Sequence, residues 1–429
     1  MSTTGNYNAI TKVDFYDEET ISVNHLPPDT VSRDIDDDDF IHVPRISDDV
    51  PEEEIAVSEK VINSAVRLFN SGLITKDEYL QLVDSNAKYR QEAKCGEEET
   101  FRAKLEGYFG LDWELKKVKL LGLDISETGG QVQSQSDSVA SDSDDKAKGS
   151  GLHLNNKEWP ERDLRCFIVK SNDDLRQEVA CIQLIELCQE IFAECNLSDT
   201  LWLKPYRIVS TGPAAGFVET LPNTLSIDAI KKTDNFVSLP HFFQNLYGGS
   251  SARLLKAKKN FVKSLAAYSL VSYILSIKDR HNGNILIDQE GHVIHIDFGF
   301  LFGIAPGGNF SIESAPFKLT EEMLEVFGGI DSDMFSEYVK AFTQGFLALR
   351  SKSTAILSAV SLIANDSSFP CFQGKDVASI LDKLRQRFKC EMSSADAIEH
   401  CLELIIQSYG SMGTRQYDSF QWYTNGIIP

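Results

Sequence analysis

The chain has 429 residues, which is long enough for a two-lobed domain of about 250 to 300 residues together with smaller modules. Its 64 acidic and 42 basic residues leave a net charge of −22, and this balance argues against a nucleic-acid-binding protein that relies on overall positive charge. The acidic excess is concentrated near the start, where residues 1–60 hold 16 acidic and 4 basic side chains.

Nothing in the sequence predicts a membrane-spanning or exported chain. No stretch reaches the roughly 18 consecutive apolar residues that a transmembrane helix needs. Residues 1–19 have neither the basic start nor the apolar run of a signal peptide. The eight cysteines form no CxxC pair and have no His partner at zinc-finger spacing. We therefore expect a cytoplasmic protein with reduced thiols, whose membrane contact is peripheral.

The first 151 residues divide into three segments of different composition. Residues 1–54 are polar, acidic and aperiodic, which predicts a disordered tail, either simply solvated or used for docking. Residues 55–123 carry apolar residues at helical spacing and a capping box formed by Thr75 and Glu78, so we expect a helical segment. Residues 124–151 are rich in Ser, Asp, Gln and Gly and predict a flexible insert.

The globular part of the chain begins near residue 152 and opens with strands around one long helix. "LRCFIVK" is rich in β-branched and aromatic residues and predicts a strand that leads to Lys170. "DDLRQEVACIQLIELCQEIFAEC" (173–195) predicts a helix with acidic residues in its first turn. "LWLKPYRIVST" and "GFVETLPN" predict two strands on either side of a Gly-Pro turn.

Further along, the chain passes through the stretch "KDRHNGNILIDQEGHVIHIDFGF" (278–300). The apolar segment 264–275 predicts a buried helix that leads into it. "NILI" and "HVIHI" predict a hairpin whose turn contains Gly291. This hairpin brings Asn284 and Asp297 to one edge, where an amide oxygen and a carboxylate can share a hard cation.

The spacing within this stretch fits phosphoryl transfer. That reaction needs oxygen ligands for magnesium, a group that accepts the hydroxyl proton and a cation on the nucleotide phosphates. Protein kinases place their catalytic Asp five residues before the metal-binding Asn, and Asp279 and Asn284 keep this distance. However, residues 279–281 read Asp-Arg-His and not the His-Arg-Asp of protein kinases.

"KDRHNGNIL" followed by "HIDFG" resembles the signature of the phosphatidylinositol 3- and 4-kinase superfamily, which contains lipid kinases and large protein kinases related to them. The resemblance implies an α+β, two-lobed, protein-kinase-like fold, with a small β-rich N-lobe at 152–222 and a larger helical C-lobe at 223–429. It also implies that ATP is a substrate.

The same resemblance implies the roles of four residues in the quoted stretch. Asp279, His281, Asn284 and Asp297 would be catalytic, and Asn284 and Asp297 would hold Mg²⁺ or Mn²⁺. His281 and Asp279 are both candidates for the group that accepts the lipid hydroxyl proton. His281 would alternatively stabilise the transferring phosphate.

The nucleotide site is also implied by resemblance. Lys170 would contact the ATP phosphates and Glu178 would position it, whereas the phosphate loop departs from the family pattern. Its nearest counterpart, "GSGLHLNN", lacks the usual Pro, so Ser150 and Gly151 are candidates on backbone chemistry alone. The residues expected around adenine are Tyr206, Glu219, Leu221 and Ile296.

The expected activation segment, "FGFLFGIAPGGNFSIESAPFK" (298–318), bears on the substrate. Its only charged side chains are Glu313 and Lys318, whereas binding a multiply phosphorylated inositol lipid calls for a cluster of Arg and Lys. We therefore expect unphosphorylated phosphatidylinositol as the substrate.

Three further segments narrow the resemblance. "APFKLTEEMLEVFGG", "FPCFQG" and "YDSFQWYTNGI" resemble the type III beta phosphatidylinositol 4-kinases. This implies phosphorylation of the 4-hydroxyl at Golgi or endosomal membranes, with a small GTPase or a Golgi adaptor as a partner. A related protein Ser/Thr kinase and a scaffold with incidental catalysis remain alternatives.

The aromatic segment "FQWYTNGIIP" leaves two interpretations open. It places Phe420, Trp422 and Tyr423 together, which suits a membrane interface. The same residues also suit a helix that packs on the C-lobe.

Overall fold

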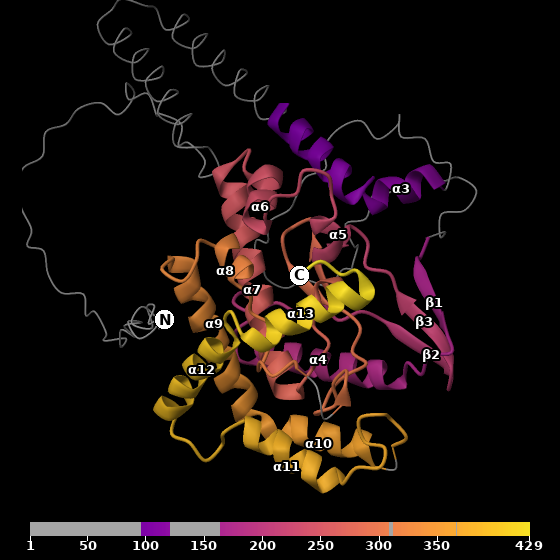
Figure 1. The fold of residues 1–429 in the computed structure, drawn as a ribbon, viewed down its shortest axis with the longest axis vertical. Coiled ribbons are helices and arrows are strands. Elements are labelled where there is room, and N and C mark those ends of the chain that lie inside the picture. The colour runs from indigo at the N-terminus through magenta and orange to yellow at the C-terminus, as the bar shows by residue number, and fades with distance from the viewer. Residues whose placement is uncertain (1–95, 121–163, 309–311, 366) are drawn as a thin grey trace, which may run out of the picture.

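The computed structural model describes residues 96–120, 164–308, 312–365 and 367–429. These residues have an α+β fold in which a small sheet lies beside a larger, mostly helical part (Figure 1). This confirms the predicted two-lobed class. The predicted tail, the helices expected before residue 96, the insert at 124–151, Ser150 and Gly151 lie outside the described residues. The lobe boundaries stay a prediction.

Two three-stranded sheets and a series of helices make up the described fold. In chain order the strands are β1 (Phe167–Ser171), β2 (Ile208–Gly212), β3 (Ala215–Glu219), β4 (Thr224–Ser226), β5 (Ile285–Asp288) and β6 (Val293–His295). Residues 96–109 are helical, and the elements that follow are α3 (Trp113–Leu120), α4 (Arg176–Glu194), α5 (Ile227–Lys231), α6 (Leu239–Tyr247), α7 (Ser251–Leu275), the 3₁₀ turn η3 (Asn282–Asn284), α8 (Glu321–Val326), α9 (Asp333–Ser351), α10 (Ser353–Ala364), α11 (Val377–Arg387), α12 (Ser394–Ser408) and α13 (Met412–Asn425).

The first sheet is antiparallel in the order β1-β3-β2, with α4 packed against it (Figure 1). In its register Lys170 of β1 lies opposite Gly216 of β3, where an added Cβ would lie 2.5 Å from the carbonyl oxygen of Val209. The predicted strand that starts at Leu201 begins only at Ile208. The residues before it are drawn into the core instead, and Pro205 has no N–H to offer a ladder.

The second sheet, β4-β5-β6, contains the predicted hairpin. Gly291 in its turn has φ +89°, and a Cβ there would lie 2.8 Å from the carbonyl oxygen of Ala257, so both conformation and space require glycine. Beyond the ladder, the N–H of Ile296 donates to the carbonyl of Asn284 at 3.1 Å. This bond places Asn284 and Asp297 at one edge, as predicted.

Helix α7 is the central helix of the larger part. Residues 264–275 are buried as predicted, but the helix begins earlier, at Ser251, where the side chain of Ser250 caps it. It packs against α9, and the Tyr338 hydroxyl donates to Ser269 at 3.2 Å across this contact. Within the described residues, no single helix is both long and apolar enough to cross a membrane; α9 and α10 meet that criterion only jointly, across a 66° bend.

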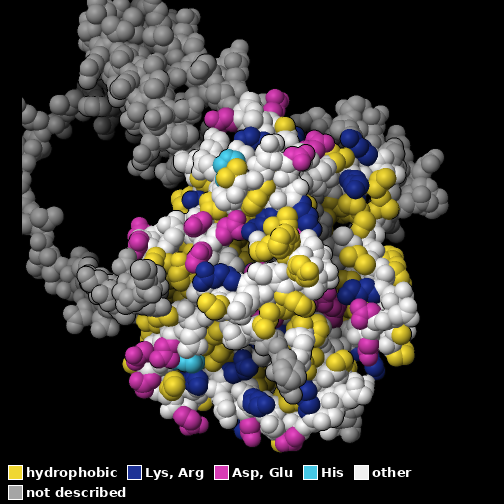
Figure 2. Space-filling view, viewed as in Figure 1, with side chains coloured by type: hydrophobic (Ala, Val, Ile, Leu, Met, Phe, Trp, Pro, Cys, Tyr) yellow, Lys and Arg dark blue, Asp and Glu magenta, His cyan; other side chains and the backbone are white. Residues whose placement is uncertain are grey.

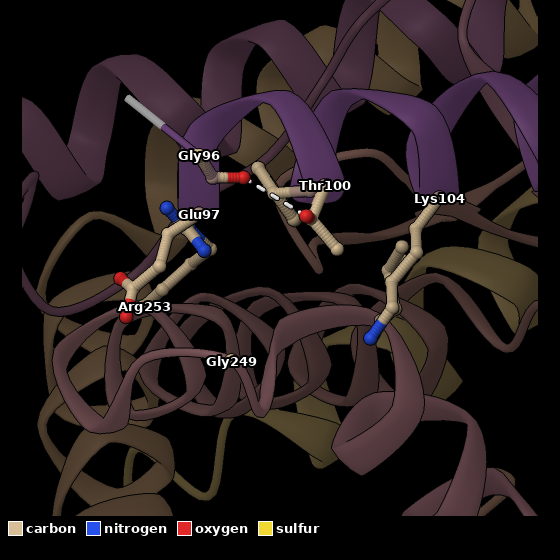
Figure 3. A pocket seen from close by; sticks show the side chains of 8 residues that line it. Gly96, Glu97, Thr100, Lys104, Gly249 and Arg253 are labelled. Carbon is tan, nitrogen blue, oxygen red and sulfur yellow. Dashed lines mark hydrogen bonds between the residues drawn. The ribbon is translucent and has the colours of Figure 1, made fainter. Parts of the chain in front are cut away.

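The helical residues before the first sheet dock on the larger part. Helix 96–109 lies along α6, where Lys104 donates to the carbonyl of Asn245 at 2.7 Å. A pocket of about 230 Å³ opens between this helix and the start of α7, next to Arg253 (Figure 3). Ahead of α3, Asp112 accepts from the side chain of Asn223 at 2.8 Å, and Asn223 accepts from the N–H of Trp113 at 3.1 Å. The segment is thereby tied to the connection between β3 and β4.

Candidate active site

Asp279 lies where the chain leaves α7 and turns toward β5. Ser276 ends the helix in the left-handed conformation, and Asp279 itself has φ +65°. The N–H of Asp279 donates to a carboxylate oxygen of Glu313 at 2.7 Å. Its carbonyl accepts from the side-chain amide of Asn284 at 3.0 Å. These two bonds fix the main chain on which the Asp279 carboxylate is carried.

Arg280, the middle residue of the Asp-Arg-His triplet, is 1% exposed and bonds to main-chain carbonyls. Its guanidinium donates to Lys278 at 3.1 Å, to Ile296 at 2.8 Å and also to Asp297. It lies 5.4 Å from the centre of the Phe298 ring. Arg280 therefore braces the loop that carries Asp279 against the chain that carries Asp297.

Asn284 and Asp297 have the donor atoms that a hard cation requires. Because the amide nitrogen of Asn284 is used by Asp279, its amide oxygen is the atom available to a metal. Asp297 is exposed and has φ +61°. No cluster of three or more His, Cys, Asp or Glu at metal-binding distance occurs in the described parts of the chain. The two residues thus fit a Mg²⁺ ion that is held jointly with nucleotide phosphates, whose charge it would neutralise.

Lys170 and Glu178 meet beside Asp297. The Lys170 ammonium lies 3.5 Å from Glu178 and 3.4 Å from Asp173. Burial lowers the pKa of Lys170, but the surrounding carboxylates, Glu178 first, outweigh it and raise that pKa. Burial raises the pKa of Glu178 to about 7 against the attraction of Lys170, and the nearby charge of Asp297 adds to the increase. The site thus keeps a permanent cation next to Asp297.

His281 caps η3, and this contact determines which ring nitrogen carries a proton. Its Nδ1 accepts from the N–H of Gly283 at 3.1 Å. Burial lowers the pKa of His281 more than the charge of Asp279 raises it, so the ring is neutral near pH 7. The proton of the neutral ring is then on Nε2, which lies 3.8 Å from a carboxylate oxygen of Asp279. His281 is therefore arranged to donate a hydrogen bond from Nε2.

Comparison with known proteins shows which group of proteins this arrangement belongs to. The family described as "Phosphatidylinositol 3- and 4-kinase" matches residues 166–373, which include all of the groups described above. The chain contains a phosphatidylinositol 3- and 4-kinase domain.

Curated relatives carry names that are more specific. "Phosphatidylinositol 4-kinase beta 1" of Arabidopsis thaliana is 44% identical over 274 residues, 63% of this chain and 24% of that protein. "Phosphatidylinositol 4-kinase" of Dictyostelium discoideum is 41% identical over 272 residues, 63% of this chain and 23% of that protein. "Phosphatidylinositol 4-kinase PIK1a" of Candida albicans is 40% identical over 355 residues, which are 79% of this chain and 33% of that protein. The chain spans about a quarter to a third of the length of these relatives.

The structure shows the surroundings of the residues that are expected around adenine. Tyr206 is 4% exposed and stacks on Phe298 with 6.4 Å between ring centres. The N–H of Glu219 donates to the carbonyl of Arg207 at 2.8 Å. Leu221 and Ile296 are partly buried against the core. Their contacts with ATP stay a prediction.

Both charged side chains of the activation segment bind other residues of the chain. Glu313 accepts from the main chain of Asp279 and, at 3.4 Å, of Arg280. Lys318 is 6% exposed and binds both carboxylate oxygens of Asp418, at 2.6 and 2.8 Å. The described part of the segment therefore presents no charged side chain to a substrate.

The sequence analysis missed the polar residues of α13 that reach the site. The Tyr417 hydroxyl donates to a carboxylate oxygen of Asp279, and Gln421 approaches the same oxygen at 3.4 Å. The available signal was the spacing of four between two polar residues in an otherwise aromatic helix. Glu313 was noted for its charge alone.

Proposed function

We propose that this protein is a lipid kinase that transfers the γ-phosphate of ATP to the 4-hydroxyl of phosphatidylinositol. The observation that carries the proposal is that both charged side chains of the activation segment, Glu313 and Lys318, bind other residues of the chain. A headgroup with additional phosphates would find no Arg or Lys there. The names of the relatives support the 4-position.

The proposed chemistry assigns one task to each group. Asn284 and Asp297 would hold Mg²⁺ or Mn²⁺, which would supply charge neutralisation on the phosphates, and Lys170 adds a fixed cation. Asp279 accepts the proton of the inositol hydroxyl as its oxygen bonds to the γ-phosphorus, while the bond from that phosphorus to the β-phosphate oxygen breaks and ADP leaves. His281, neutral and protonated on Nε2, donates a hydrogen bond to the transferring phosphate.

A peripheral membrane location is part of the proposal. On α13, Phe420, Trp422 and Tyr423 are 51, 58 and 88% exposed. Hydrophobic side chains gather near the centre of the face over α13 (Figure 2). Amphipathic aromatics of this kind suit the boundary between lipid and water. A Golgi or endosomal membrane, and recruitment by a small GTPase or an adaptor, stay predictions from resemblance.

The test is a product analysis. The full chain is incubated with Mg·ATP and phosphatidylinositol in detergent micelles, and the deacylated product is identified by chromatography. We expect a 4-phosphate, which disappears with Asp297→Ala because a ligand of the metal is lost. A 3-phosphate would reject the position, and labelled protein without labelled lipid would favour the Ser/Thr kinase. An Asp297→Ala variant that retained full cellular function would favour the scaffold.

A further inference from the structure

One face of helix α13 buries polar groups, whereas aromatic residues elsewhere on the helix are exposed. Tyr417, Asp418 and Gln421 are 3, 6 and 5% exposed. The aromatic residues Phe420 and Trp422, between and beside them, are more than half exposed. Burying a polar face is costly unless each group finds a partner. The partners of this face therefore indicate what it does.

The partners form a directed chain of hydrogen bonds that ends on Asp279. Asn425 donates to the amide oxygen of Gln421 at 2.6 Å, and the amide nitrogen of Gln421 donates to the Tyr417 hydroxyl at 2.7 Å. Because the Tyr417 oxygen accepts from Gln421, its own proton is directed to the carboxylate of Asp279. Burial and this carboxylate both raise the pKa of Tyr417, so the hydroxyl stays protonated.

The helix itself is fixed at two places. Asp418, beside Tyr417, forms the buried pair with Lys318 at the end of the activation segment. Beyond the helix, the carbonyl of Ile428 accepts from Asn282 in the catalytic loop at 2.8 Å, and its N–H donates to Asp228 at 2.8 Å. The helix that carries Tyr417 is thus held at Asp418 and, through the residues that follow it, at Ile428.

We infer that Tyr417, supported by Gln421, is a positioning residue that holds the Asp279 carboxylate in the orientation needed to accept the substrate hydroxyl proton. The inference rests on the proposed function for the identity of that hydroxyl. The second oxygen of Asp279 has only a long contact, 3.4 Å, to Asn284 and remains open to a substrate. A hydrogen bond on one carboxylate oxygen orients the other without occupying it.

The test compares two buried tyrosines. In Tyr417→Phe the ring stays, and the hydroxyl is lost together with its bond to Asp279 and the bond that it accepts from Gln421. Tyr338→Phe is the matched control, because its hydroxyl is equally buried but contacts Ser269 between α7 and α9. For each variant, kcat and the KM for ATP are measured with phosphatidylinositol micelles, together with Mg·ATP hydrolysis without lipid and the unfolding midpoint.

We expect Tyr417→Phe to lower kcat about tenfold or more with an unchanged KM for ATP, since misplacing a reacting group slows the chemical step. Tyr338→Phe should keep kcat, even if its unfolding midpoint falls. An unchanged or increased kcat in Tyr417→Phe, or an equal loss in both variants, would overturn the inference.

Hydrolysis of ATP without lipid tests this inference independently of the proposed function, because water then takes the place of the lipid hydroxyl next to Asp279. If the wild-type protein makes no lipid product but Tyr417→Phe lowers hydrolysis, the proposed substrate is wrong and the positioning role stands. If the wild-type protein has neither activity, both are overturned.

Discussion

The acidic residues Asp279 and Asp297 both have left-handed backbone conformations, which few residues other than glycine adopt. Asp is among those that tolerate this region. Neighbouring groups hold each of them: Glu313 binds the N–H of Asp279, and Arg280 binds the carbonyl of Asp297. Conformations of this kind persist where the surroundings over-determine them. The placement of the reacting carboxylates therefore depends on residues that perform no chemistry themselves.

Arg280→Met tests this dependence. We expect it to lower the free energy of unfolding by about 2 to 4 kcal/mol, because main-chain carbonyls on both sides of the site lose a buried donor. Urea unfolding would measure the change. Arg385→Met is the control, since this side chain is 61% exposed and pairs only with Asp382, and it should change the free energy by less than about 0.5 kcal/mol. Similar losses in both variants would contradict the bracing role.

The pKa of Glu178 predicts a pH dependence. Because burial raises that pKa to about 7, Glu178 is neutral below this pH and cannot pair with Lys170. We expect kcat/KM for ATP to rise through about pH 7, since this ratio reports ionisations of the free enzyme. In Glu178→Gln, the value of kcat/KM above pH 7 should be lower, and the rise near pH 7 should be absent. If the rise persisted in this variant, it would come from the ionisation of another group.

The same shift has a consequence for stability, with the opposite sign. The folded-state pKa of Glu178 lies above its ordinary value of 4.5, so its contribution to stability is fully present below pH 4.5 and is lost as the pH rises through about 7. Thermal unfolding of the wild type and Glu178→Gln across this range would follow the difference, which should shrink as the pH rises.

The sequence predicted Asp279, Asn284 and Asp297 together because their spacing is local and a hairpin brings them to one edge. It could not predict that Glu313 binds Asp279, or that Tyr417 does, because these contacts join residues 34 and 138 positions apart. Such pairs depend on how helices approach each other, which periodicity does not specify.

Among the helices, α7 and α4 were predictable because long apolar periodicity marks them. The exact start of α7 was not, because its first turns are rich in lysine and lie outside the buried stretch. Helix α13 was the hardest to interpret, since Phe420, Trp422 and Tyr423 suited either a membrane interface or a packed face, and the structure exposes these three residues. The ion pair and hydrogen bonds formed by the side chains of α13 determine which face of this helix is buried, chiefly the pair of Lys318 and Asp418.

Breaking that ion pair should therefore loosen α13. Lys318→Met leaves Asp418 buried without its partner, and we expect a loss of about 3 to 5 kcal/mol in the free energy of unfolding. In the double variant Lys318→Met/Asp418→Leu, most of this loss should be recovered, because no buried charge remains. Denaturant unfolding of the three proteins measures both steps. Equal stability of the single and double variants would argue against a buried charge as the cause.

Across the chain as a whole, the described fold extends beyond both ends of the residues that match the family. The match covers residues 166–373. Helix 96–109 precedes the match and packs on α6, and α11, α12 and α13 follow the match. The described helices outside the match carry none of the motif residues from Lys170 to Asp297. What these helices pack against emerged from the structure.

The contact of Tyr417 with Asp279 means that the segment that matches the family lacks one of the residues that contact the proposed proton acceptor. A chain trimmed to residues 166–373 would keep every motif residue named above from Lys170 to Asp297 and still lose the neighbour that orients its proton acceptor. The family match therefore marks the residues of the motif, whereas the contact that holds the Asp279 carboxylate comes from α13, beyond the matched residues.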